Sequence, residues 1–181
     1  MTPERDLTYR TALENHRRAV RDVLTVLESV PERRWGASLA KGKWTVAQLT
    51  EHLALSYEIA LDGLTGGPGM KQVLPWWKTR FLRLTILRRI LRGQGFPEGA
   101  PAPRELRPGM EPLNRDQGIE RLRATAAEAE SALESAPDSA RVPHAYFGLL
   151  TAKQILGVQT AHLDHHRTQV EGFLWRSMLT S

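Results

Sequence analysis

The sequence of 181 residues contains no cysteine. Disulfide bonds, thiolate metal ligands and cysteine nucleophiles are therefore excluded. No apolar run approaches the ~20 residues that a membrane-spanning helix needs. The charged start, MTPERDLTYR, has no apolar stretch of the kind found in signal peptides. We therefore expect a cytoplasmic protein without a membrane span.

The sequence also lacks segments that alternate between apolar and polar residues and are bounded by turn signals, so strands are not required. Helix signals are frequent instead. Thr45 and Gln48 have the capping-box spacing, in which each side chain bonds the backbone N–H of the other residue. The same spacing recurs at Thr151 and Gln154, and Asn114 is a further N-cap. The expected helices cover residues 3–30, 46–64, 76–92, 115–136 and 152–177.

Glycine and proline are concentrated between Gly93 and Gly109, where they make up eight of seventeen residues. This composition predicts an irregular crossover and not a helix. Four long helices with one long central connection are typical of a four-helix bundle. We therefore expect an all-α fold and a single domain over residues 1–181, with a basic helix and the crossover in residues 76–110.

The net charge is +5, and the excess of positive charge is local. Residues 76–110 carry eight cationic side chains against two carboxylates, which leaves the rest of the chain close to neutral. A domain built to bind phosphates has a basic face on its main body, so we expect no nucleic-acid partner. The basic segment 78–92 is either a solvated helix face or an interaction surface for a membrane or an acidic partner.

Three histidines lie within five residues of the last helix, in AHLDHHRTQVEGFLW (residues 161–175). At ~100° per residue, His162, His166 and Gln169 fall within the apolar stripe of this helix, and His165 lies on its edge. Two imidazoles at i and i+4 can share a metal ion, and buried polar side chains need a common partner. The alternative is a hydrogen-bonded histidine network without a metal. We expect His165 not to be a ligand.

A tetrahedral metal site with one open position needs a third protein ligand. His16 stands between charged neighbours, so we expect it to be solvated, and His144 precedes an aromatic loop. His52 lies at the border of the apolar face of its helix and can turn toward a neighbouring helix. The predicted metal ligands are therefore His52, His162 and His166.

Two stretches resemble the DinB/YfiT-like metalloenzymes, namely GKWTVAQLTEHLALS and HAYFGLLTAKQILGVQTAHLDHHRTQV. In that family the second helix carries one histidine ligand in an HL pair. The last helix carries two more as H-x-x-x-H, followed by a glutamine. The resemblance carries these roles to His52, His162 and His166, with Gln169 as the trailing glutamine. It implies an up-down-down-up four-helix bundle with a long crossover, frequently a homodimer, and a divalent metal held by three histidines.

Relatives in this family include thiol-dependent S-transferases and isomerases. The resemblance therefore implies a metal-dependent enzyme, of the thiol S-transferase or hydrolase type, that acts on a small molecule such as a low-molecular-weight thiol. We expect zinc or nickel, with iron as a further candidate, because imidazole suits all three metals. Catalytic residues stay unassigned, because Glu51 and Asp164 are expected to face solvent. The alternatives are a non-catalytic bundle with a degenerate histidine site and an interaction module that acts through segment 78–92.

Overall fold

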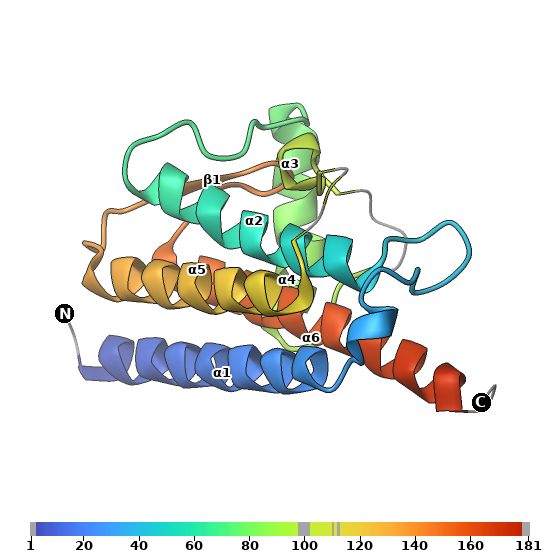
Figure 1. The fold of residues 1–181 in the computed structure, drawn as a ribbon. Coiled ribbons are helices and arrows are strands. Elements are labelled where there is room, and N and C mark those ends of the chain that lie inside the picture. Colours follow the sequence, from blue (N-terminus) through green and yellow to red (C-terminus); the bar gives the residue numbers. More distant parts are fainter. Residues whose placement is uncertain (1–2, 98–101, 110, 112, 179–181) are drawn as a thin grey trace.

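Four long helices form the body of the computed structural model, which describes residues 3–97, 102–109, 111 and 113–178. They are α1 (Pro3–Glu28), α2 (Val46–Leu64), α5 (Arg115–Ser135) and α6 (Ala152–Met178). Helices α1 and α6 run in one direction and α2 and α5 in the other (Figure 1). The most extensive packing is between α1 and α6 and between α2 and α5. The predicted up-down-down-up four-helix bundle is thereby confirmed.

The predicted capping residues begin three of these helices. At α2 the Thr45 hydroxyl accepts from the Gln48 N–H, and the Gln48 amide oxygen accepts from the Thr45 N–H, both at 3.1 Å. Thr151 and Gln154 make the same reciprocal pair at α6, and the Asn114 side chain accepts from a backbone N–H of α5. These bonds satisfy N–H groups that have no partner within the helix.

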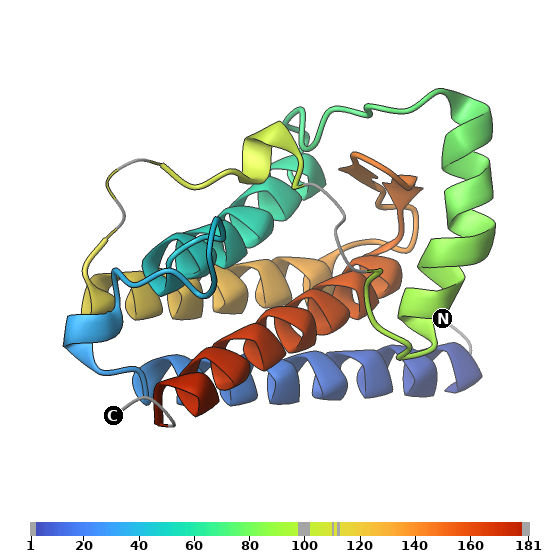
Figure 2. The same cartoon turned by 90° about the vertical axis from the view of Figure 1, so that its right-hand side faces the viewer.

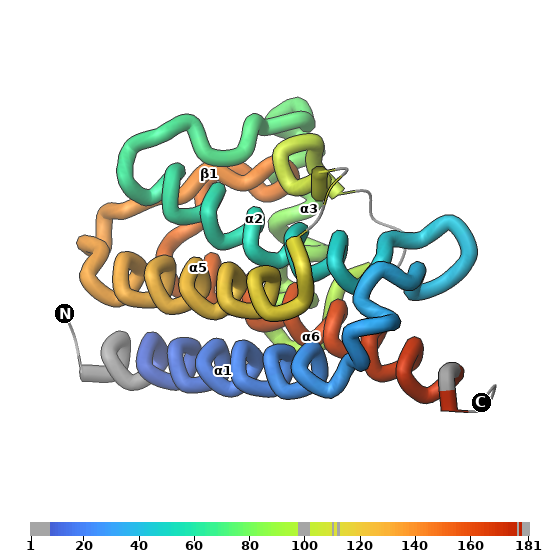
Figure 3. Tube along the Cα trace, in the orientation of Figure 1, coloured from blue at the N-terminus to red at the C-terminus, as the bar shows by residue number. Residues whose placement is uncertain are grey.

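A long connection links α2 to α5 and can be followed along the tube of Figure 3. It contains α3 (Trp76–Leu82), the π-helical turn η2 (Arg83–Leu87) and α4 (Arg88–Leu91), so the predicted helix over 76–92 contains a stretch with a wider turn. This helical segment stands across one end of the bundle (Figure 2). The described part of segment 93–109 is irregular apart from the short 3-10 helix η3 (Arg104–Leu106), as predicted.

Two strands were not expected from the sequence. The strands β1 (Val142–His144) and β2 (Gly148–Leu150) pair antiparallel as a hairpin just before α6, and His144 is opposite Gly148. Gly148 has a φ of 66°, a conformation that side chains with a Cβ rarely adopt. A second short 3-10 helix, η1 (Glu32–Arg34), follows α1. The hairpin is a local addition and leaves the all-α class unchanged.

Leucine side chains from all four long helices fill the centre of the bundle. Leu27 of α1, Leu49 and Leu53 of α2 and Leu122 of α5 have no exposed surface, and Leu163 of α6 is 1% exposed. Burial of such side chains contributes about 1.5–3 kcal/mol each to stability. Among the described residues, none of the helices has the length and apolar character needed to span a bilayer.

Replacing Leu122 by alanine should lower the free energy of unfolding by about 2–5 kcal/mol, because it leaves a cavity between α2 and α5. The matched control is Leu149→Ala, since the Leu149 side chain is 58% exposed. This control should change stability by no more than about 0.5 kcal/mol. Urea denaturation followed by circular dichroism measures both values. Equal losses in the two variants would contradict this description of the core.

Candidate metal centre

Three histidine rings converge between α2 and α6. His52 comes from the middle of α2, and His162 and His166 lie one turn apart on α6. The Nε2 atom of His162 is 2.9 Å from Nε2 of His52 and 3.1 Å from Nε2 of His166. One ring nitrogen from each of the three residues lies within 4.8 Å of the other two. Ligand nitrogens of a tetrahedral zinc ion are about 3.3 Å apart, so the spacing fits a metal site after small shifts.

The far nitrogens of two of these rings are held by the surrounding structure. The Nδ1 atom of His52 is 2.7 Å from the backbone oxygen of Leu106 in η3. A carbonyl oxygen only accepts, so this Nδ1 carries the proton. The Nδ1 atom of His166 donates in the same way to Oε1 of Gln169, at 3.0 Å. Such outer contacts fix the tautomer and the orientation of metal-binding imidazoles.

The distribution of protons leaves this cluster short of a donor. With Nδ1 protonated, the Nε2 atoms of His52 and His166 both present lone pairs to His162. His162 Nε2 carries one proton at most, which bridges only one of the two gaps. The lone pair in the other gap then faces a His162 nitrogen that has no proton to offer it. A cation among the three nitrogens would satisfy all of them, so the donor set fits a divalent metal.

Burial keeps all three rings neutral, which metal binding requires. Desolvation lowers the pKa of His166 to about 3, with a further contribution from His52. Desolvation lowers the pKa of His162 well below its ordinary value, and the neighbouring histidines add to this shift. The pKa of His52 is also lowered by burial, although its bond to Leu106 opposes the shift. At neutral pH the cluster therefore presents lone pairs and not charges.

The cluster opens into a largely apolar cavity of about 770 Å³. Among the described residues that line it there is no aspartate or glutamate. The cationic side chains in its wall are Lys43 and Arg176, which are both exposed. Its apolar wall comes from the loop before α2, the helical segment over α3 and η2, the crossover and the hairpin, and includes Trp44, Leu82, Ile86, Phe96, Val142 and Phe147.

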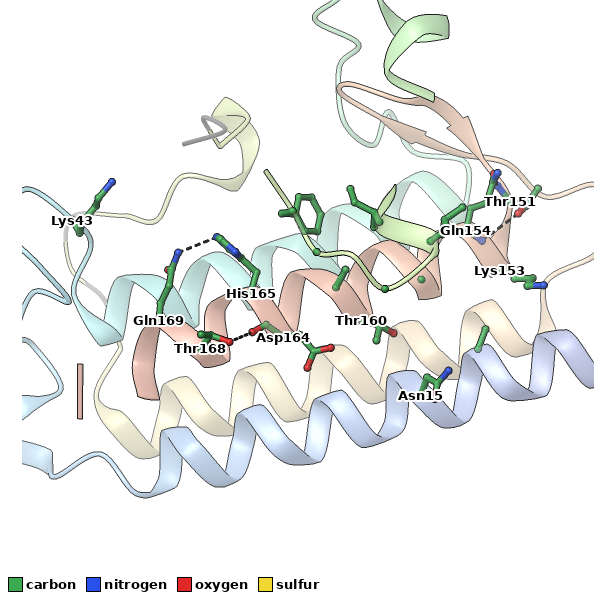
Figure 4. A pocket seen from close by; sticks show the side chains of 18 residues that line it. Asn15, Lys43, Thr151, Lys153, Gln154, Thr160, Asp164, His165, Thr168 and Gln169 are labelled. Carbon is green, nitrogen blue, oxygen red and sulfur yellow. Dashed lines mark hydrogen bonds between the residues drawn. The ribbon is translucent and has the colours of Figure 1, made fainter. Parts of the chain in front are cut away.

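A second cavity, of about 1310 Å³, is lined by residues of α1, α4, the chain just after α4, and α6 (Figure 4). Its wall shares five residues with the first cavity, namely Lys43, Phe96, His165, Thr168 and Gln169. The Nε2 atom of Gln169 donates to Nε2 of His165 at 2.9 Å, so Gln169 links His165 to His166. Gln169 was expected within the buried stripe of α6, but it is exposed. His165 is outside the group of three converging nitrogens.

Two further expectations from the sequence are wrong. His16 is fully buried and not solvated. Its polar atoms have partners inside the protein, since its Nε2 lies 2.7 Å from the hydroxyl of Tyr57 and its Nδ1 lies 3.3 Å from a carboxylate oxygen of Glu130. Glu51 does not face open solvent, since only 17% of its side chain is exposed and it lies 4.0 Å from Arg121. Glu51 is not in the wall of the histidine cavity, so it is no candidate for a base there.

Sequence reasoning missed the contributions of the loops to this centre. The Trp44 ring packs on His52 with a centroid separation of 4.7 Å, and Phe96 lies 5.8 Å from His162. Trp44 directly precedes the capping box of α2, which is the one local signal that would have placed it near His52. The backbone oxygen of Leu106 has no signature in the sequence.

The family model of the DinB superfamily matches residues 12–170, and the chain belongs to this superfamily. A solved mycothiol-dependent maleylpyruvate isomerase has a similar fold, with a TM-score of 0.58 and 20% identity. The similarity covers 94% of this chain and 63% of the isomerase, so the chain spans less than two thirds of that protein's length. A solved four-helix bundle protein has a TM-score of 0.49 and 20% identity, over 90% of this chain and 98% of its own. No curated protein matches the chain.

The free energy of unfolding of the metal-free protein should fall as the pH is lowered from about 7 to about 5. Burial lowers the pKa of His144 to about 4, so in this range the unfolded chain takes up a proton that the folded chain does not. This residue alone should cost about 2 kcal/mol over that interval. Urea denaturation at both pH values, with a chelator present, measures the loss. His144→Gln should show a smaller loss, and an equal loss would contradict the prediction.

Proposed function

We propose that His52, His162 and His166 bind one divalent metal ion and that the chain is a metal-dependent enzyme. The observation that carries the proposal is the pair of Nε2 contacts at 2.9 and 3.1 Å among three neutral rings. Two of these rings direct lone pairs inward because their Nδ1 atoms donate elsewhere. A hydrogen-bonded network leaves one contact without a proton, whereas a metal ion uses every lone pair.

The three imidazole ligands narrow the choice of metal to a few ions and do not identify a single one. Three imidazoles and no thiolate or carboxylate suit zinc, nickel and iron. Three neutral ligands leave the ion its full positive charge and at least one open position. We propose zinc or nickel as the ion, with iron as the third candidate.

The cavity favours a small substrate with an apolar body and an anionic group. Its wall is largely apolar, and Lys43 and Arg176 are the cationic side chains among the described residues that line it. A thiolate has this charge, and because the chain has no cysteine the thiol would have to come from a second molecule. A low-molecular-weight thiol as substrate is consistent with the mycothiol-dependent isomerase that shares the fold.

A bound divalent metal would lower the pKa of a water or thiol that it coordinates, so that hydroxide or thiolate is available as a nucleophile at neutral pH. The chain contributes the orientation of the ligand rings through Leu106 and Gln169. The largely apolar wall makes the cavity less polar than bulk water, which strengthens electrostatic interactions within it. His144 and His165 are the further imidazoles in the wall and are our candidates for moving a proton.

Purified protein loaded with zinc or nickel should retain about one ion per chain after gel filtration. His162→Ala should lose this ion, because His162 Nε2 is the atom that the other two rings contact. The matched control is His165→Ala, which removes the adjacent imidazole from the same helix and should retain the ion. Elemental analysis measures the stoichiometry. Equal metal content in the two variants, or no metal in the wild-type protein, would favour the non-catalytic histidine network.

The metal-loaded protein should consume a low-molecular-weight thiol in the presence of an electrophilic acceptor. A screen with glutathione, mycothiol and bacillithiol, followed by loss of free thiol, measures this activity. His162→Ala should reduce the rate by about 100-fold or more, since the metal supplies the nucleophile. If His162→Ala lost its metal but kept the wild-type rate, the metal would have no part in the reaction.

A further inference from the structure

The helical segment over α3, η2 and α4 presents large apolar side chains to solvent. Trp77, Phe81 and Leu84, which we call the outer stripe, are 55%, 62% and 51% exposed. Their spacing of four and three residues puts them on one face of the helix. Trp76 at the start of α3 is 76% exposed. None of these four side chains lines either of the two cavities.

Cationic residues lie before, within and after the outer stripe in the sequence. Between residues 70 and 97 the chain has no aspartate or glutamate. Residues 70–97 carry seven cations, and five of them lie in the helical segment itself; the seven are Lys71, Lys78, Arg80, Arg83, Arg88, Arg89 and Arg92. Within the described part of the chain, none of the seven makes an ion pair with a carboxylate. The segment therefore offers both apolar surface and net positive charge to a partner.

The opposite face of the segment is fixed to the bundle. Leu87 and Ile90 are buried, and the Arg83 guanidinium donates to the backbone oxygens of Phe147 and Leu149 at 2.7 and 2.8 Å. Figure 2 shows the segment standing at one end of the bundle. Because the inner face is anchored in this way, the outer stripe points away from the rest of the molecule.

We propose that this segment binds the surface of an anionic lipid membrane. A helix with aromatic and aliphatic side chains on one face and arginine around them lies in the interface between lipid and water. Tryptophan is favoured at that depth, and each nearby cation adds attraction to an anionic leaflet. Charge also argues against a second copy of the chain on this surface, because the exposed cations around the outer stripe would face the same cations of the other copy.

Membrane binding would place the wall of the histidine cavity next to the lipid. Leu82 and Ile86, from the inner side of the same segment, line that cavity. The outer stripe and the cavity wall are thus two sides of one helical segment. The proposal concerns the outer surface alone and does not depend on a metal ion.

The test is co-sedimentation of the full chain with vesicles of phosphatidylcholine that contain about 30% phosphatidylglycerol. Wild-type protein should bind in about 50 mM salt and be released in about 500 mM salt, because salt screens the attraction. It should not bind vesicles of phosphatidylcholine alone. Absence of binding to the anionic vesicles at low salt would overturn the proposal.

Two double variants separate charge from apolar insertion. Arg80→Glu with Arg88→Glu, and separately Trp77→Ser with Phe81→Ser, should each lower the partition coefficient by about tenfold or more. The control is Arg21→Glu with Arg33→Glu, which makes the same charge change at two exposed positions of the main body and should bind more tightly than Arg80→Glu with Arg88→Glu. Circular dichroism checks that every variant is folded.

Two other results would contradict a lipid partner. One is that the Trp77→Ser, Phe81→Ser variant binds the anionic vesicles as tightly as the wild-type protein does, because that binding would depend on positive charge alone and not on the apolar side chains. The other is that the chain binds a nucleic acid tightly, or associates with itself, and that these substitutions abolish this binding but leave vesicle binding unchanged. Either result would assign the outer stripe to a different partner.

Discussion

The contact of three imidazole nitrogens between α2 and α6 is the constraint on which the functional account depends. Burial makes the rings neutral, and bonds from His52 to Leu106 and from His166 to Gln169 turn two lone pairs toward His162. Three such nitrogens share too few protons to satisfy one another. A buried polar atom without a partner costs about 1–3 kcal/mol, so the cluster favours a cation at its centre.

The packing of the bundle leaves room for this contact. Helices α1 and α6 form one close pair and α2 and α5 the other, whereas α2 and α6 meet less extensively. The histidines and their cavity occupy the seam between the two pairs. Loops cover the histidines at this boundary between the helix pairs. Trp44, just before α2, packs on His52, and the crossover places Phe96 and the backbone oxygen of Leu106 next to the rings. The irregular crossover is therefore part of the centre.

The bundle and the three histidines were accessible from the sequence because their signals are local. The capping boxes set the starts of α2 and α6, and the spacing of His162 and His166 puts both on one face. The burial of His16 was not accessible, since its partners Tyr57 and Glu130 are distant in the sequence and its neighbours in the chain are charged.

The hairpin and the hydrogen bonds that orient the histidine rings have weaker signals in the sequence than the helices and the histidines themselves. Strands of three residues, one of them containing Pro143, are too short to show an alternating pattern. The bond from His52 goes to a backbone oxygen, which any residue at position 106 would provide. Sequence reasoning therefore identified the side chains that converge and missed the backbone that orients them.

The most direct test of the central claim is an X-ray absorption spectrum of the chain loaded with one equivalent of zinc. The account predicts a first coordination shell that contains three imidazole nitrogens at about 2.0–2.1 Å, with the remaining position taken by an oxygen ligand such as water. A shell of oxygen atoms alone, or one with a single imidazole, would contradict the assignment of His52, His162 and His166 as a metal centre.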